Sequence, residues 1–176
     1  HRLDKDTSGL ICVALTEEAR MRLSEAFAAR EIRKEYLALV QGVPAPAGTV
    51  DAPLGRHPTV KVKVAVVKNG KEARSEWRVL YKGQGYSLLG VRIFTGRTHQ
   101  IRVHMSWQGH PLFNDERYGG DRILKGTTFS KYKQFIENCF AVMPRHALHA
   151  QSLGFVHPMT HEAVYFESEL PDDFRA

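Results

Sequence analysis

The first ten residues, His-Arg-Leu-Asp-Lys-Asp-Thr-Ser-Gly-Leu, crowd charges of both signs against the start of an apolar run. Asp4 lies just before this run, at a loop position of the kind that often carries reactive side chains. Thr7 and Ser8 follow closely and could hold such a loop through hydroxyl and backbone hydrogen bonds. A purely structural interpretation competes, because Asp and Ser before a strand often only order a turn. The residues alone leave both interpretations open.

A second candidate is Arg102, which stands between Ile101 and Val103 in the segment HQIRVHM. A guanidinium flanked by apolar residues needs an acidic partner if it is buried, because an unpaired buried charge is costly. Asp4 and Arg102 could satisfy each other in this way. The alternative is an exposed arginine on a helix face.

Nine histidines raise the question of a metal site. His146 and His149 are three residues apart, a spacing at which two histidines of one helix can bind the same metal ion. No third ligand with a recognised spacing accompanies them, so no metal is expected. The glycines at 83 and 85 lack the following helix and lysine of a nucleotide-binding loop.

The composition is that of a globular protein large enough for one domain, with 176 residues and 43% apolar residues. No apolar stretch approaches the roughly 18 residues of a membrane span. The net charge of +6 fits either nucleic-acid binding or a solubilising basic surface. Cys12 and Cys139 lie in apolar surroundings, so we expect buried free thiols and a reducing, cytoplasmic location.

Hydrophobic patterning predicts the elements that must position these residues. An apolar run at 10–15 predicts a buried strand, followed by a helix to about residue 30 that Thr16 caps. Alternation at 60–67 and 73–79 around Asn69-Gly70 predicts a hairpin with a basic face. Further elements are predicted as strands at 36–40, 86–94, 148–156 and 163–166 and a helix at 132–140.

The segment TGRTHQIRVHMSWQG fits two kinds of element. Ile101, Val103 and Met105 alternate as in a strand, whereas Thr98 as an N-cap and Gly109 as a stop favour a helix of about ten residues. We expect the helix.

Six segments of the chain match one known family in the family's order: HRLDKDTSGL, RKEYLALVQG, GRHP, GKEARSEWRVL, TGRTHQIRVHMSWQGHPLFNDERYGG and RHALHAQSLGFVHP. Together they cover nearly the whole chain and resemble the RluA-type pseudouridine synthases, which modify ribosomal or transfer RNA. The resemblance implies an α+β fold: a mixed, largely antiparallel sheet with flanking helices, forming one catalytic domain at 1–176 that lacks the family's upstream strands. An expected insertion at 123–143 would pack on the domain or contact RNA or a partner.

The resemblance also implies a reaction, the isomerisation of specific uridines in structured RNA to pseudouridine, with base flipping and without a cofactor or metal. Asp4 matches the family's catalytic aspartate, and Arg102 matches its basic partner. Tyr36 matches the tyrosine that stacks on the base and is a candidate for proton removal at C5. Ile101 matches an apolar residue beneath the base, and Arg2 matches the arginine that enters the vacated stack.

RNA is therefore the expected partner, with no membrane, and the full-length protein is expected to be a monomer. Arg97, Lys61 and Lys63 are further candidates for phosphate contacts. The rival function is a non-catalytic RNA-binding or chaperone module that uses the same basic cleft. The presence of Asp4, Tyr36 and Arg102 together favours the enzyme.

Overall fold

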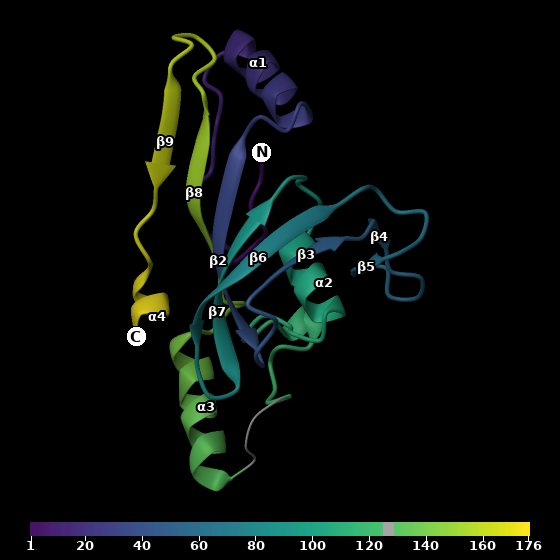
Figure 1. Cartoon of the computed structure of the whole chain (residues 1–176), viewed down its shortest axis with the longest axis vertical. Coiled ribbons are helices and arrows are strands. Elements are labelled where there is room, and N and C mark those ends of the chain that lie inside the picture. The colour runs from purple at the N-terminus through teal and green to yellow at the C-terminus, as the bar shows by residue number, and fades with distance from the viewer. Residues whose placement is uncertain (125–128) are drawn as a thin grey trace.

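The computed structural model describes residues 1–124 and 129–176 as a twisted sheet with helices at both ends and on one side (Figure 1). The main sheet has the strand order β1-β8-β2-β7-β6-β3, and β9 pairs with β8 beyond β1, on the edge that β2 does not occupy. Within the described residues, the β1–β8 pair of this sheet is parallel and its other strand pairs are antiparallel. The expected mixed, largely antiparallel α+β fold is confirmed. The strands of this sheet are β1 (Ser8–Gly9), β2 (Arg33–Gln41), β3 (Ala47–Asp51), β6 (Arg74–Lys82), β7 (Tyr86–Ile93), β8 (Leu148–Val156) and β9 (Ala163–Glu167).

Four α-helices and one short 3-10 helix accompany the sheet in the described residues: α1 (Glu17–Ala28), α2 (Gln100–Trp107), η1 (Glu116–Tyr118), α3 (Ser130–Val142) and α4 (Asp172–Arg175). As expected, Thr16 caps α1, and its hydroxyl accepts a hydrogen bond from the Ala19 N–H at 3.2 Å. Figure 1 places α1 and α3 at opposite ends of the molecule. None of the described helices is long and apolar enough to cross a membrane.

One cluster of the hydrophobic core forms between β2, β7, β8 and α2. Ile101 and Met105 of α2 pack in one cluster with Tyr36, Leu89 and Ala150 of the three strands. Because side chains alternate across a strand, Lys34, Tyr36 and Ala38 of β2 share one face of the sheet. This packing fixes α2 against the strand that carries Tyr36.

The expected strand at 10–15 is wrong, since β1 ends at Gly9. The Leu10 N–H still bonds to the Ala150 carbonyl at 3.0 Å, but β9 pairs with β8 from Ser152 onward and β2 holds the other edge. No β8 edge is therefore left for residues 10–15. Leu10 instead packs in a cluster with Cys12 and α1, while alternate residues such as Val13 are exposed.

The expected hairpin between 60–67 and 73–79 is also wrong. Strand β5 (Val64–Val66) pairs with β4 (Leu54–Arg56) in a separate two-stranded sheet, while β6 pairs with β3 and β7. The turn at Asn69-Gly70 leads to a bridge between Lys71 and Leu54, and Gly70 lies so close to the Leu54 backbone that a Cβ would meet it at 2.6 Å. Alternating residues signal a half-buried strand and do not identify its partner.

The helix expected after Thr98 is confirmed, and the strand alternative is wrong. Thr98 does not cap it, because α2 begins at Gln100 and its N-cap is His99, with φ of 56° and no side-chain capping bond. The Gln100 side chain closes the preceding turn by accepting hydrogen bonds from the Thr95 hydroxyl at 2.8 Å and the Arg97 N–H at 3.1 Å. Gly109, with φ of 80°, follows the end of the helix as expected.

The other predicted elements are confirmed: the strands at 36–40, 148–156 and 163–166 fall within β2, β8 and β9, and the helix at 132–140 falls within α3. The strand predicted at 86–94 matches β7, which ends one residue earlier. Ile136 of α3 is buried in a cluster with Phe113, Met143 and Ala147. The expected insertion thus packs on the domain through α3, while its residues 125–128 lie outside the described part.

Candidate active site

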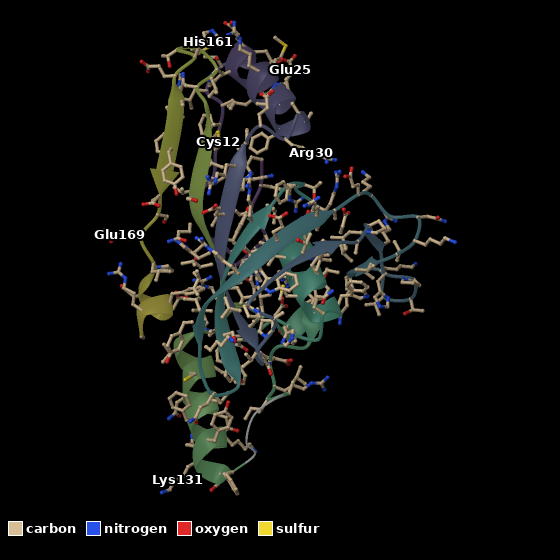
Figure 2. The ribbon with its side chains drawn as sticks, in the orientation of Figure 1. Cys12, Glu25, Arg30, Lys131, His161 and Glu169 are labelled. Carbon is tan, nitrogen blue, oxygen red and sulfur yellow. The ribbon has the colours of Figure 1, made fainter. Side chains whose placement is uncertain are left out.

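A cavity of about 460 Å³ lies between the N-terminal segment, β2 and the turn before α2. Asp4, Tyr36, Ile101, Arg2 and Arg97, all singled out from the sequence, border it. Figure 2 shows Arg30, another lining residue, just beyond the end of α1 at the rim of the sheet. The volume suits a small organic group. The remaining lining residues are His1, Leu3, Thr7, Phe27, Ala28, Lys34, Ile93, Phe94, Thr95, Gly96, Thr98, Gln100 and Leu148.

Asp4 makes the expected contact with Arg102, which is not itself a lining residue of the cavity and which also pairs with a second carboxylate that sequence reasoning missed. The Arg102 guanidinium, 6% exposed, donates to both oxygens of Asp115, which is 1% exposed, at 2.7 and 2.9 Å. Its Nη1 atom lies 3.5 Å from Oδ2 of Asp4. Burial is the largest single influence on the pKa of Arg102 and lowers it, but the hydrogen bonds with Asp115 and the negative charges of Asp115 and Asp4 together outweigh burial, so the pKa is raised. Arg102 therefore stays charged and presents one free edge to Asp4.

Arg102 is also covered by an aromatic ring. The Tyr118 ring lies 5.1 Å from the guanidinium carbon, and its hydroxyl is 2.7 Å from Nδ1 of His99. A guanidinium over an aromatic face gains a cation–π attraction. Asp115 also caps η1, since its Oδ1 accepts a hydrogen bond from the Tyr118 N–H at 3.3 Å. The sequence signal for Asp115 was only that of a helix cap, which does not reveal an ion pair.

Hydrogen bonds on the other side hold the loop that carries Asp4. The Thr7 N–H bonds to the Asp4 carbonyl at 3.1 Å, and the Thr7 hydroxyl is 2.7 Å from Nε2 of His146. Burial, followed by the positive charge of Arg102, lowers the pKa of His146 to about 4. His146 is therefore neutral near pH 7 and supports the loop without adding charge. The loop is ordered and also faces the cavity, so the turn-ordering and reactive interpretations of this segment are compatible.

Tyr36 borders the cavity beside Asp4. Burial, together with the negative charge of Asp4, raises the pKa of Tyr36 to about 12. At neutral pH the ring is therefore a protonated phenol, able to stack on a base or donate a hydrogen bond. Ile101 and Leu148 supply apolar surface in the same cavity.

The charges that line the cavity are strongly asymmetric. Among the described residues, Asp4 is the one carboxylate in the lining, whereas Arg2, Arg30, Lys34 and Arg97 are cationic. Such an excess of positive charge attracts a polyanion. The mouth of the cavity is therefore suited to phosphate-bearing ligands.

Lys61 and Lys63 are not brought to this cavity. They lie in the turn between β4 and β5, where the Lys63 N–H bonds to the Val60 carbonyl at 2.9 Å. The Lys63 ammonium is 6.0 Å from the Tyr118 ring, whose nearer contact is Arg102. Any contact of these lysines with a ligand would therefore be outside the cavity.

The histidines that suggested a metal site have other partners. His146 contacts Thr7, and Nδ1 of His149 is 2.9 Å from the Ser8 hydroxyl. His104 lies between the Ser75 hydroxyl and the Ala52 carbonyl. Within 1–124 and 129–176, no group of three or more His, Cys, Asp or Glu side chains could hold a metal ion.

Comparison with known proteins agrees with this geometry. A family model described as RNA pseudouridylate synthase matches residues 1–107. Ribosomal large subunit pseudouridine synthase D of Nitrosomonas europaea is 45% identical over 176 residues, which are all of this chain and 48% of that protein. The protein of the same name from Pseudomonas aeruginosa is 45% identical over 174 residues, 99% of this chain and 53% of that protein. The chain thus spans about half the length of these curated relatives.

Solved structures give the same result. Human RNA pseudouridylate synthase domain containing 1 aligns with a TM-score of 0.74 and 30% identity, covering 97% of this chain and 68% of that one. The family match covers the segments that carry Asp4, Tyr36 and Arg102. The chain belongs to the RNA pseudouridylate synthase family, and within it to the RluA type.

Proposed function

We propose that this protein isomerises specific uridines in structured RNA to pseudouridine, with Asp4 as the catalytic carboxylate. The observation that carries the proposal is the placement of Asp4. Its carboxylate lies 3.5 Å from Arg102, in a cavity that Tyr36 and Ile101 also border. The Arg102 guanidinium thus places a positive charge beside the carboxylate that the reaction needs as its reactive group.

The proposed reaction needs no external reagent. The N1–C1′ bond of the uridine breaks, the uracil rotates within the cavity, and a C5–C1′ bond forms. The hydrogen on C5 leaves as a proton and N1 gains one, so the product is an isomer of the substrate. Asp4 promotes the first step through its carboxylate, and Arg102 holds that carboxylate in position.

The uridine must leave its base stack to reach Asp4, at a cost of a few kcal/mol. Stacking of the uracil on Tyr36 would return about 1–3 kcal/mol of this cost. Ile101 would support the base from below, and Arg2 would occupy the space that the base leaves. Because the pKa of Tyr36 is raised to about 12, its phenol is protonated when the uracil enters the cavity. Tyr36 would then stack on the base and donate a hydrogen bond, and it would have to lose this proton before it could accept the one from C5.

Large-subunit ribosomal RNA is the first substrate class to test, because the relatives from Nitrosomonas and Pseudomonas carry that substrate in their names. Transfer RNA is the second. Arg2 and Arg97 would contact phosphates at the cavity mouth, and Lys61 and Lys63 would contact a more distant part of the same RNA.

Two further properties complete the proposal. Asp4, Tyr36 and Arg102 meet within one chain, so the site does not need a second copy and the protein would act as a monomer. Cys12 and Cys139 are free, half-buried rather than fully buried, and packed in separate clusters. Free thiols suit a reducing compartment such as the cytoplasm.

The test is tritium release from transcripts labelled with [5-³H]uridine, because replacement of the C5 hydrogen accompanies isomerisation. We expect release from large-subunit ribosomal RNA, with pseudouridine recovered after digestion to nucleosides. Tight RNA binding without release or pseudouridine would contradict the enzyme and favour the non-catalytic RNA-binding module.

A further inference from the structure

Lys34 is a buried cation to which the site described above gives no role. Its residue is 7% exposed, although lysine is almost never fully buried unless it is paired. Among the described residues it has no ion pair or side-chain hydrogen bond. Its ammonium nitrogen lies over the Phe27 ring, 5.5 Å from the ring centre, in a cation–π contact. An unpaired buried charge is costly, so a missing anionic partner would explain its position.

The ammonium group reaches the cavity beside the proposed base site. Lys34 lies two residues before Tyr36 on β2, so both side chains project from the same face, about 7 Å apart along the strand. Both border the cavity. A Cβ built on Gly96 would lie 3.7 Å from Nζ of Lys34, which places the ammonium against the turn before α2.

This part of the cavity is electropositive. Arg97 follows Gly96, and its charge acts with burial to lower the pKa of Lys34, burial being the larger cause. The positive end of α2 begins three residues later, with no acidic residue in its first turn and no side-chain cap. Asp4, the one lining carboxylate in the described residues, contacts Arg102 instead.

We propose that Lys34, with Arg97 and the turn at Gly96, binds the backbone phosphate adjacent to the uridine that enters the cavity. This inference rests on the proposed function, because it takes the uracil to lie against Tyr36. A phosphate between the two cations would remove their mutual repulsion and supply the missing anion. Lys34 is then a substrate-binding residue that makes the cavity select a nucleotide of an RNA chain over a free nucleoside.

The competing explanation is structural, with the lysine stem simply covering Phe27. The test titrates uridine, uridine 3′-monophosphate and uridine 5′-monophosphate into isotope-labelled protein and follows the Lys34 side-chain resonances. We expect at least one monophosphate to bind about tenfold tighter than uridine and to shift these resonances. Equal affinity of all three ligands, or resonances that do not move, would overturn the proposal.

Two variants and a matched control sharpen this result. Lys34→Met keeps the length and the contact with Phe27 but should lose the preference for the monophosphate, whereas Lys34→Arg should retain most of it. Lys82→Met makes the same charge change on an exposed residue of β6 outside the cavity lining, and should leave the preference unchanged. A preference that survives in Lys34→Met would refute the subsite. If Lys34→Met fails to fold, the wild-type titration and Lys34→Arg still decide.

The tritium-release assay separates this failure from failure of the proposed function. A wild-type protein that isomerises RNA, with Lys34→Met equal to it in single-turnover rate and RNA affinity, would refute the phosphate subsite alone. A wild-type protein that releases no tritium refutes the proposed function, and the monophosphate titration then decides whether the phosphate site exists.

Discussion

Replacing Asp115 by Asn should destabilise the protein far more than the same change at Asp4. Both carboxylates contact Arg102, but only Asp115 accepts two hydrogen bonds from it, at 2.7 and 2.9 Å. The Asp4 contact is a single one at 3.5 Å, at the outer limit of a hydrogen bond. Asp115→Asn therefore leaves a buried guanidinium without its main partner.

The expected magnitude follows from burial. Arg102 and Asp115 are 6% and 1% exposed, so their ion pair is almost entirely removed from water. Removing one partner of such a pair costs about 3–5 kcal/mol, because the other charge stays buried. For a protein of this size that corresponds to a fall in melting temperature of about 6–20 °C. Asp4→Asn should cost about 1 kcal/mol or less, since Arg102 keeps its pair with Asp115.

Urea denaturation measures these costs in wild type, in the single variants Asp115→Asn, Arg102→Met and Asp4→Asn, and in the double variant Asp115→Asn with Arg102→Met. The double variant should lose less than the sum of the two single changes, because it leaves no unpaired charge. A cost below about 1 kcal/mol for Asp115→Asn, or an equal cost at Asp4, would refute the division between a structural carboxylate and a reactive one.

Three further predictions concern pH, backbone and RNA contacts. Because burial lowers the pKa of His146 from 6.5 to about 4, the unfolded state binds the extra proton between these values. The free energy of unfolding should then fall by up to about 3 kcal/mol as pH drops from 6.5 to 4, and His146→Gln should remove this part of the slope in denaturation at several pH values. Gly9 has φ of 106°, and a Cβ there would meet the Ala150 carbonyl oxygen at 2.1 Å. Gly9→Ala should therefore lower the free energy of unfolding by about 2 kcal/mol or more in the same assay, and an unchanged denaturation midpoint would contradict this. Replacing Lys61 and Lys63 together by Ala should weaken RNA binding and flatten its salt dependence while single-turnover chemistry at saturating RNA stays near normal, and an unchanged slope would place their turn outside the RNA contact surface.

The sequence predicted those parts of the site that depend on local pattern and chemical need. A buried Arg102 required an acid, and Asp4, 98 residues away, is indeed one of its partners. The strand of Tyr36 was predicted because a run of apolar residues forms the centre of a sheet. The helix of Arg102 was predicted from a glycine stop, although its start is set by the Gln100 side chain rather than by Thr98.

The parts that failed depend on partners distant in the chain. The run at 10–15 is apolar enough for a strand, but β9 and β2 occupy the edges of β8 that it would need. The alternation at 60–67 predicted a strand next to 73–79, whereas the strand that forms there, β5, pairs with β4. Asp115 could not be recognised as the main partner of Arg102, because a lone acid before a short helix has the same local signature when it only caps that helix.

The central claim is that Asp4 performs the chemistry, and the direct measurement is pseudouridine formation by Asp4→Asn at saturating RNA. This change keeps the size of the side chain and removes its charge. The account predicts that turnover is lost while RNA affinity stays within about tenfold of wild type, because phosphate contacts dominate binding. Appreciable pseudouridine formation by the pure Asp4→Asn protein would contradict it.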